Sequence, residues 1–158
     1  MKVIPAISFS VTTSRGPAWK LILDGEKTCT TRKARLKGRP EAGLIASLYW
    51  KQRQPRVITF DGGGEKQYSK PIHKVGEAYI TKVRRISSLK AVWGDKEYAA
   101  KEGFSSLEEM RHYWVPQMPS KGQYTLEMQP LIDRILAMLG PMDIITWQYP
   151  LKENGKLL

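Results

Sequence analysis

Cysteine and histidine are scarce in this chain of 158 residues. The single cysteine, Cys29, excludes an intramolecular disulfide, and the two histidines, His73 and His112, are too far apart for the ligand spacing of a zinc site. No apolar run approaches the roughly 20 residues that a membrane-spanning helix needs. We therefore expect a protein without a metal or other cofactor and without a membrane partner.

Acidic residues are also few compared with basic ones. The chain has 26 Lys and Arg against 15 Asp and Glu, which gives a formal net charge of +11. With 41% hydrophobic and 26% charged residues, the composition is that of a folded globular protein, and the length suits one domain. The apolar stretch at residues 1–5 is too short for a signal peptide. We expect a basic, cytoplasmic, single-domain protein whose partner is a polyanion.

The excess positive charge is concentrated in the first sixty residues, where 12 basic residues stand against 3 acidic ones. The densest part, residues 27–39, contains no acidic residue and six basic ones: Lys27, Arg32, Lys33, Arg35, Lys37 and Arg39. A run of one sign repels itself unless an anion lies nearby, and the planar guanidinium of arginine matches phosphate geometry. We therefore interpret this run as a phosphate-binding surface. The alternative is a solvated basic loop.

Hydrophobic alternation and turn residues predict a chain made mainly of strands. We expect strands at residues 6–11, 28–32, 44–50, 56–60, 66–72, 77–86 and 143–149. Helix-capping residues and apolar periodicity predict helices at 18–23, 96–101, 106–114 and 130–139. Because the helices are inserted between strands without regular β–α–β alternation, we expect an α+β fold, a small mixed β-barrel with flanking helices.

A glycine-rich segment at residues 61–64 separates two of the predicted strands. It lacks the Gly-Lys-Ser/Thr ending of a phosphate-binding loop, and a strand rather than a helix follows it. We therefore interpret it as the turn of a β-hairpin.

Two motifs and one strand carry a resemblance to a known family. The first motif, Gly-x-Lys-x-x-Thr-x-Arg, occupies residues 25–32 directly after a predicted helix. The second, at residues 101–110, is similar to a helix start of the form Glu-Gly-(aromatic or apolar)-Ser-Leu-Glu-Glu, and residues 75–83 form the strand. Together they resemble the ASCH domain family, whose fold is similar to that of the PUA RNA-binding domain.

The resemblance implies that residues 1–158 form a single ASCH domain with a PUA-like fold. It covers residues 6–115 and the closing strand at 143–149. The segments at about 52–72 and 117–141 are additions to the minimal domain. The family usually has Gly-Asp at the start of the strand after the basic loop, where this chain has Gly43 and Leu44.

Lys27 and Thr30 lie three residues apart at a predicted helix-to-strand junction, where a turn can bring the ammonium beside the hydroxyl. A threonine hydroxyl is a weak nucleophile unless a base removes its proton, and Glu102 can orient the lysine or carry protons. In the bacterial ASCH enzymes that hydrolyse N4-acetylcytidine, the residues matching these three form the catalytic set. The resemblance thus implies that Lys27, Thr30 and Glu102 are catalytic and that Arg32 holds an anionic or carbonyl oxygen. The alternative is that they are ordinary strand-edge and helix-end residues.

Cys29 lies inside the first motif and is a candidate nucleophile. Strand alternation turns its side chain away from Thr30. We therefore expect a buried structural thiol.

One aromatic residue joins the basic run as a candidate ligand contact. Tyr49 and Trp50 end a predicted strand beside Lys51 and Arg53, and rings interleaved with cations suit base stacking. The candidate ligand-binding residues are Arg32, Lys33, Arg35, Lys37 and Tyr49.

Two functions fit these features. The first is an RNA- or nucleotide-binding domain that holds a phosphate and a base in a basic cleft around the first motif. The second is a hydrolase, either an N4-acetylcytidine amidohydrolase or a ribonuclease, that uses Lys27, Thr30 and Glu102. A third, weaker alternative is a small-nucleotide sensor whose C-terminal helix contacts a partner protein.

Overall fold

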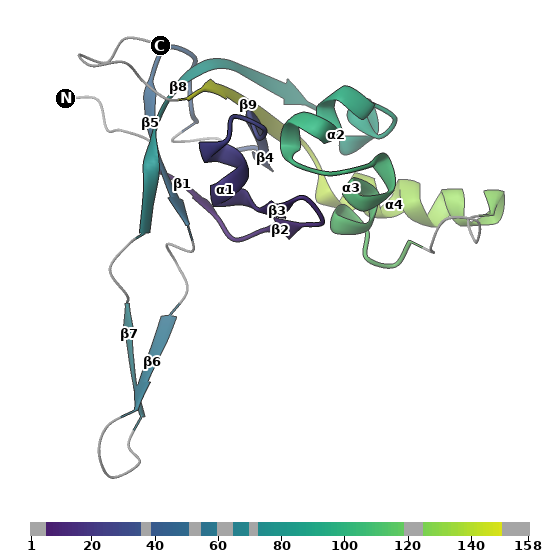
Figure 1. Cartoon of the computed structure of the whole chain (residues 1–158). Helices are drawn as coiled ribbons and strands as arrows, with labels where there is room; N and C mark the ends of the chain where they lie inside the picture. Colours follow the sequence, from purple (N-terminus) through teal and green to yellow (C-terminus); the bar gives the residue numbers. More distant parts are fainter. Residues whose placement is uncertain are drawn as a thin grey trace.

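The computed structural model describes residues 6–35, 39–50, 55–59, 65–69, 73–118 and 125–149. Its centre is a curled five-stranded sheet with the strand order β1–β5–β8–β9–β4 (Figure 1). These strands are β1 (Ala6–Phe9), β5 (Ile45–Trp50), β8 (His73–Ile86), β9 (Met142–Gln148) and β4 (Cys29–Lys33). The pair β1–β5 is parallel, and the other pairs in this sheet are antiparallel. The α+β class expected from the sequence is confirmed, and the curled sheet is a half-barrel.

Four helices accompany the sheet: α1 (Ala18–Leu23), α2 (Lys96–Glu102), α3 (Leu107–Trp114) and α4 (Gln129–Leu139). Short 3₁₀ turns, η1 (Leu89–Val92) and η2 (Leu126–Met128), precede α2 and α4. Within the part of the chain described here, no helix has the length and apolarity required to cross a membrane.

Two further strand pairs lie outside the central sheet. β2 (Thr12–Thr13) and β3 (Gly16–Pro17) form one, and β6 (Pro55–Thr59) and β7 (Glu65–Ser69) form the other. β6 and β7 are antiparallel, with Thr59 opposite Glu65, so the predicted hairpin is confirmed. The glycine-rich turn itself lies outside the described residues.

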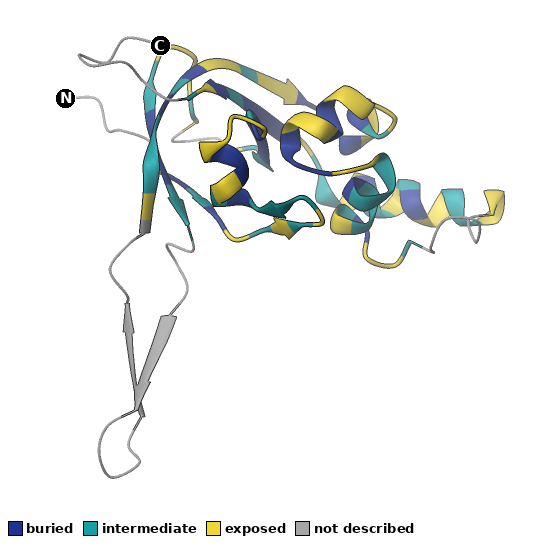
Figure 2. Ribbon diagram, in the orientation of Figure 1, coloured by how far each residue is buried: buried dark blue, intermediate teal, exposed yellow. Residues whose placement is uncertain are grey.

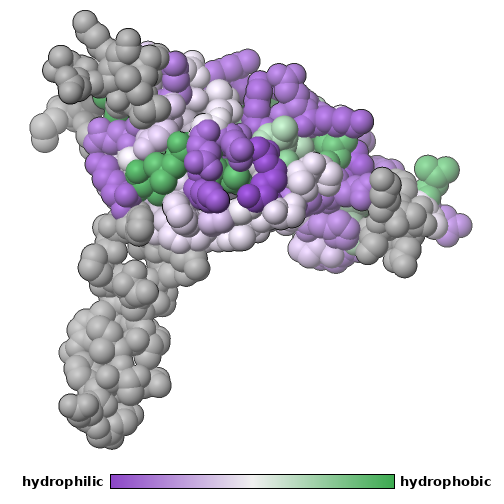
Figure 3. All heavy atoms as spheres, viewed as in Figure 1, coloured by the Kyte–Doolittle hydropathy of each residue, from purple (hydrophilic) through white to green (hydrophobic). Residues whose placement is uncertain are grey.

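The hydrophobic core has two parts, and β9 supplies both. Ile145 packs with residues of α1, β5 and β8, whereas Ile144 packs with residues of α2, α3 and α4. This is the expected result of strand alternation, because neighbouring side chains point to opposite faces of a sheet. Figure 2 shows the buried faces of the helices turned toward the sheet. Among the coloured residues of Figure 3, most are hydrophilic or near neutral in hydropathy, and the hydrophobic ones form small separate patches.

Local capping signals fix both ends of α2. The Asp95 side chain accepts a hydrogen bond from the Tyr98 N–H at 2.9 Å. Gly103 ends the helix with a φ of 101°, a left-handed conformation that favours glycine. The helix predicted at 96–101 is therefore confirmed, and it extends one residue further, to Glu102.

The start of α3 is tied to the turn between β2 and β3. The Ser106 hydroxyl accepts the Glu109 N–H at 3.1 Å, as in a capping box. The Glu109 carboxylate accepts the N–H of Ser105 at 2.9 Å and the N–H of Ser14 at 2.8 Å. Burial alone would raise the pKa of Glu109, but these hydrogen bonds outweigh it and lower the pKa below its ordinary value.

The helix α4 is part of the helical core. Its segment is one that the family resemblance implies to be an addition to the minimal domain. Ile132 and Leu136 are buried, and Ile135 and Leu139 pack against them. The sequence also predicts Leu131 in this apolar stripe, but it is 52% exposed. The buried face of α4 is narrower than its apolar stripe because, among the described residues, the helix packs on one side, against η1 and the core residues of α2 and α3.

Candidate functional site

Residues from both sequence motifs line one cavity of about 100 Å³ beside β4. Lys27 immediately precedes this strand region, Thr30 lies within β4, and Glu102 is the last residue of α2. The three candidate catalytic residues, distant in sequence, therefore meet at one site. Aromatic side chains complete the wall: Phe9, Phe104, Tyr113 and Trp114.

Lys27 and Glu102 form a buried ion pair. The Nζ of Lys27 lies 3.1 Å from Oε2 of Glu102 and 2.6 Å from its main-chain oxygen. Both side chains are only 7% exposed, so the pair is shielded from solvent. An ammonium has three N–H donors, and among the described residues only Glu102 accepts from this one. The third N–H has no acceptor among the described residues, and Nζ lies over the ring of Phe9 in the cavity wall, 5.6 Å from its centroid.

Two hydroxyl groups hold the other oxygen of the Glu102 carboxylate. Tyr98 donates a hydrogen bond to Oε1 at 2.9 Å, and the Thr31 hydroxyl donates to the same oxygen and also contacts the Tyr98 hydroxyl. Burial, followed by the charge of Glu102, raises the pKa of Tyr98, so its hydroxyl stays protonated as a donor. The carboxylate is thus fixed at both oxygens.

Neither Tyr98 nor Thr31 was among the predicted site residues. Strand alternation does place Thr31 on the face of β4 opposite Thr30. Tyr98 lies four residues before Glu102, so the two share one face of α2. Strand alternation and helix spacing could thus be taken from the sequence. The contact of Thr31 with Tyr98 and Glu102 also requires α2 to pack on β4, which those local patterns do not show.

Thr30 and Arg32 share the other face of β4. Both line the cavity, and the Thr30 hydroxyl has no hydrogen-bond partner in the described part of the chain. Arg32 donates through Nη2 to the main-chain oxygen of Ser8 and lies 5.1 Å from the ring centroid of Phe9. These contacts fix the guanidinium in the cavity wall.

Cys29 is buried on the side of β4 that faces α2, as the alternation predicts. Burial raises its pKa, and the negative charge of Glu102 raises it further. Because the thiolate is the nucleophilic form, this cysteine is an inert part of the core.

Asp143 of β9 neutralises part of the basic run. Its buried carboxylate accepts two hydrogen bonds from Arg85, Nε to Oδ1 and Nη2 to Oδ2, each at 3.0 Å. Arg39 lies 3.5 Å from Oδ1, and Arg85 also donates to the main-chain oxygen of Arg35 at 3.1 Å. The nearby anion that a run of one sign requires is therefore supplied in part by the chain itself. Two charges of the run are paired with carboxylates from distant segments: Lys27 with Glu102, and Arg39 with Asp143.

The remaining candidate ligand-binding residues lie outside the cavity. Lys33, at the end of β4, and Arg35 are exposed, and neither forms an ion pair with the described residues. Lys37 lies outside those residues. Tyr49 is half-buried in β5 and does not line the cavity, so the structure does not bring it to the other candidates.

The donor set of the cavity suits an oxygen-bearing ligand. Lys27 supplies an N–H donor and Thr30 a hydroxyl, whereas the Glu102 carboxylate is occupied by internal contacts. Within the described ranges, no group of three or more His, Cys, Asp or Glu side chains could hold a metal ion. Comparison of the chain with protein-family models, with curated proteins and with solved structures gives no match.

Proposed function

We propose that this protein is an RNA- or nucleotide-binding ASCH domain with a PUA-like fold, and that it holds a base in the cavity beside β4. The observation that carries the proposal is the combination of polar donors and aromatic walls in one cavity. Nucleobases are flat, and cytosine, uracil and guanine bear carbonyl oxygens, so such a base uses both kinds of contact. The volume of about 100 Å³ is well below the roughly 300 Å³ of drug-sized sites, so one small planar group fits.

The exposed cations at the end of β4 support a phosphate contact next to the base. Lys33 follows Arg32 directly, so the free charges begin one residue beyond the cavity wall. Neither Lys33 nor Arg35 is neutralised by a described carboxylate, in contrast to Lys27 and Arg39. Alternation points Lys33 to the face of β4 opposite Arg32, and so the phosphate of a nucleotide with its base in the cavity would reach Lys33 around the end of this edge strand.

Binding to a single-stranded RNA oligonucleotide should weaken steeply with salt, because bound phosphates release counterions. Lys33→Gln should reduce the salt slope by about 0.7, the contribution of one phosphate on a single strand. Thr30→Val, which removes only the cavity hydroxyl, should weaken binding and leave the salt slope unchanged. Fluorescence anisotropy across a salt series measures both effects.

The matched control is Lys20→Gln, which removes an exposed charge from α1 and should change neither quantity. A flat salt dependence for the unmodified chain, or no retention of RNA at low salt, would contradict the proposal.

Hydrolysis is the second candidate function, and one observation favours it: Thr30, Lys27 and Glu102 line the same cavity. In amide hydrolysis of N4-acetylcytidine, the Thr30 oxygen would attack the acetyl carbonyl carbon while a water molecule takes the hydroxyl proton. The bond between the carbonyl carbon and N4 would then break, cytidine would leave with a proton on N4, and water would hydrolyse the acetyl ester on Thr30 to acetate. Lys27 would donate to the carbonyl oxygen, where negative charge develops, and Glu102 would hold the ammonium in place. For ribonuclease activity with the same three residues, a phosphodiester of the RNA backbone would have to enter the cavity and reach the Thr30 hydroxyl.

If the chain is such a hydrolase, incubation with N4-acetylcytidine releases cytidine and acetate, and Thr30→Val lowers kcat by at least about a hundredfold. Chromatography of the nucleosides measures the turnover, and electrophoresis of RNA in the same samples reports ribonuclease activity. Thr28→Val is the matched control, because it makes the same chemical change in the same motif outside the cavity. Unchanged turnover in Thr30→Val would remove this hydroxyl from the mechanism.

A further inference from the structure

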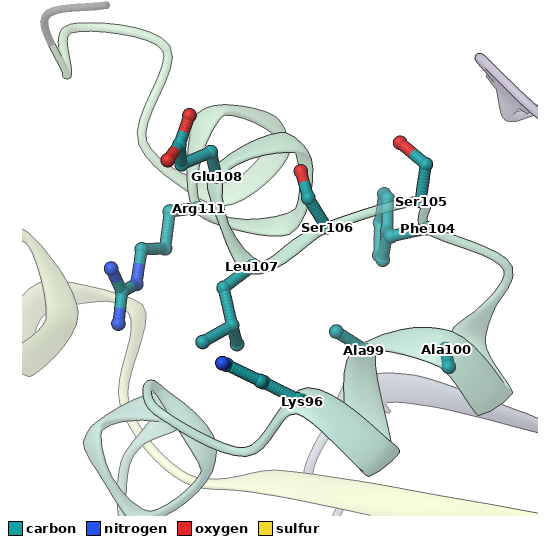
Figure 4. A pocket seen from close by; sticks show the side chains of 9 residues that line it. All are labelled: Lys96, Ala99, Ala100, Phe104, Ser105, Ser106, Leu107, Glu108 and Arg111. Carbon is teal, nitrogen blue, oxygen red and sulfur yellow. The ribbon is translucent and has the colours of Figure 1, made fainter. Parts of the chain in front are cut away.

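A second and larger pocket, of about 390 Å³, lies between α2 and α3 (Figure 4). Its volume falls within the range of roughly 300–1,000 Å³ that is usual for small-molecule sites. It lies on a different face of α2 from the ion pair, since Ala100 is about 200° around the helix from Glu102. The proposed function does not use this pocket.

The floor of this pocket is apolar. It is formed by the side chains of Ala99, Ala100, Phe104 and Leu107, which come from α2, the connecting loop and the start of α3. Small alanine side chains leave room for a flat group above the helix. Such a floor favours the ring of a ligand over a fully hydrated ion.

Two cations stand at one end of the pocket. Figure 4 shows the Lys96 ammonium and the Arg111 guanidinium at the same end, and the Glu108 carboxylate points away from Lys96. Neither cation forms an ion pair with the residues that the structure describes. Arg111 donates through Nε to the main-chain oxygen of Trp93 at 2.9 Å and lies 5.8 Å from the Trp93 ring centroid. The guanidinium is thus held in place while its Nη groups remain for an anion.

The hydroxyl groups at the other end serve the protein itself. Ser106 caps α3 by accepting the Glu109 N–H, and the Ser105 hydroxyl donates to the Glu109 carboxylate at 3.3 Å. The pocket therefore presents two cations and the Glu108 carboxylate at one end, an apolar floor in the middle, and at the other end two serine hydroxyls that contact Glu109.

We propose that the pocket between α2 and α3 binds a small organic anion, one carboxylate or phosphate group attached to an apolar ring. The anionic group contacts Lys96 and Arg111, and the ring packs on Ala99, Ala100 and Leu107. Phe104 borders this pocket and also the cavity beside β4, so the two sites share one wall.

Titration of the full chain with phenyl phosphate, followed by amide chemical shifts, tests the proposal. Phenyl phosphate should bind at least about tenfold more tightly than inorganic phosphate, with the largest shifts at residues 96–111. Lys96→Gln combined with Arg111→Gln should weaken binding by about tenfold or more, because two charge-assisted contacts are lost.

Ala100→Phe fills the pocket from an exposed helix position and should abolish binding without altering the two cations. This variant keeps the test decisive if the loss of Arg111 disturbs folding. Lys20→Gln should leave binding unchanged. Equal affinities for phenyl phosphate and inorganic phosphate, shifts confined to the cavity beside β4, or undiminished binding in Ala100→Phe would each overturn the proposal.

Discussion

Replacing Lys27 with methionine should lower the free energy of unfolding by about 3–5 kcal/mol, the usual cost of breaking a buried ion pair from one side. The lost ammonium leaves the Glu102 carboxylate buried without its cation, while Thr31 and Tyr98 still hold its other oxygen. Methionine retains most of the side-chain volume, so the change measures charge rather than a cavity. Urea denaturation followed by tryptophan fluorescence gives the difference.

The double variant Lys27→Met with Glu102→Gln removes both charges. Comparing its free energy of unfolding with that of Lys27→Met separates the cost of leaving Glu102 without a cation from the net contribution of the ion pair. Glutamine removes the charge and keeps an oxygen that Tyr98 and Thr31 can use. The double variant should therefore recover more than half of the stability that Lys27→Met loses, because the two changes are strongly coupled. Lys20→Met at an exposed position of α1 is the control and should cost less than about 0.5 kcal/mol.

A loss below 1 kcal/mol in Lys27→Met would show that the carboxylate reaches solvent or another cation. Additive losses in the double variant would show that Lys27 and Glu102 contribute separately. Either result would contradict the closed network of contacts in the structure.

Local signals predicted the elements that carry the site. The helix predicted at 18–23 has the bounds that the structure gives it, Ala18–Leu23, between Pro17 and the Asp24–Gly25 turn. The predictions for α2 and α3 are right to within one residue, because α2 ends at Glu102 rather than Lys101 and α3 begins at Leu107, after its cap Ser106. Such caps act within a few residues, so a sequence reveals them without knowledge of the fold.

Partners that come from distant segments could not be predicted in this way. Alternation showed that Cys29 and Thr30 face opposite sides of β4, but it could not show that α2 covers one of those sides. Asp143 belongs to β9, which lies between β4 and β8 in the sheet although it is the last of the described strands along the chain. The strand order depends on packing over the whole domain, and so the neutralising carboxylates of the basic run came only from the structure.

Substituting Asp143 with asparagine should lower the free energy of unfolding by about 2–3 kcal/mol. The carboxylate is 2% exposed and accepts two hydrogen bonds from Arg85, each of the charge-assisted kind. Arg85 is 35% exposed, so water partly compensates the guanidinium, and the loss should be smaller than for Lys27→Met. Urea denaturation at two salt concentrations measures the loss.

The control is Glu77→Gln, which makes the same charge change in the exposed pair Lys74–Glu77. Its cost should stay below about 0.5 kcal/mol, because surface ion pairs contribute little. Equal losses in the two variants would mean that Asp143 is not an anchor of the sheet.

The same substitution has a second consequence that depends on the proposed function. Asp143→Asn removes the only described carboxylate in contact with Arg39 and Arg85 and so frees both guanidinium groups. RNA affinity should therefore rise at low salt, with a steeper salt dependence, even though the fold is less stable. Asp143 then has two effects at once: it secures the basic run to the sheet and limits the positive charge that the run offers to a polyanion. If Asp143→Asn lowers stability but leaves RNA affinity unchanged, Asp143 only secures the basic run to the sheet and does not limit RNA binding.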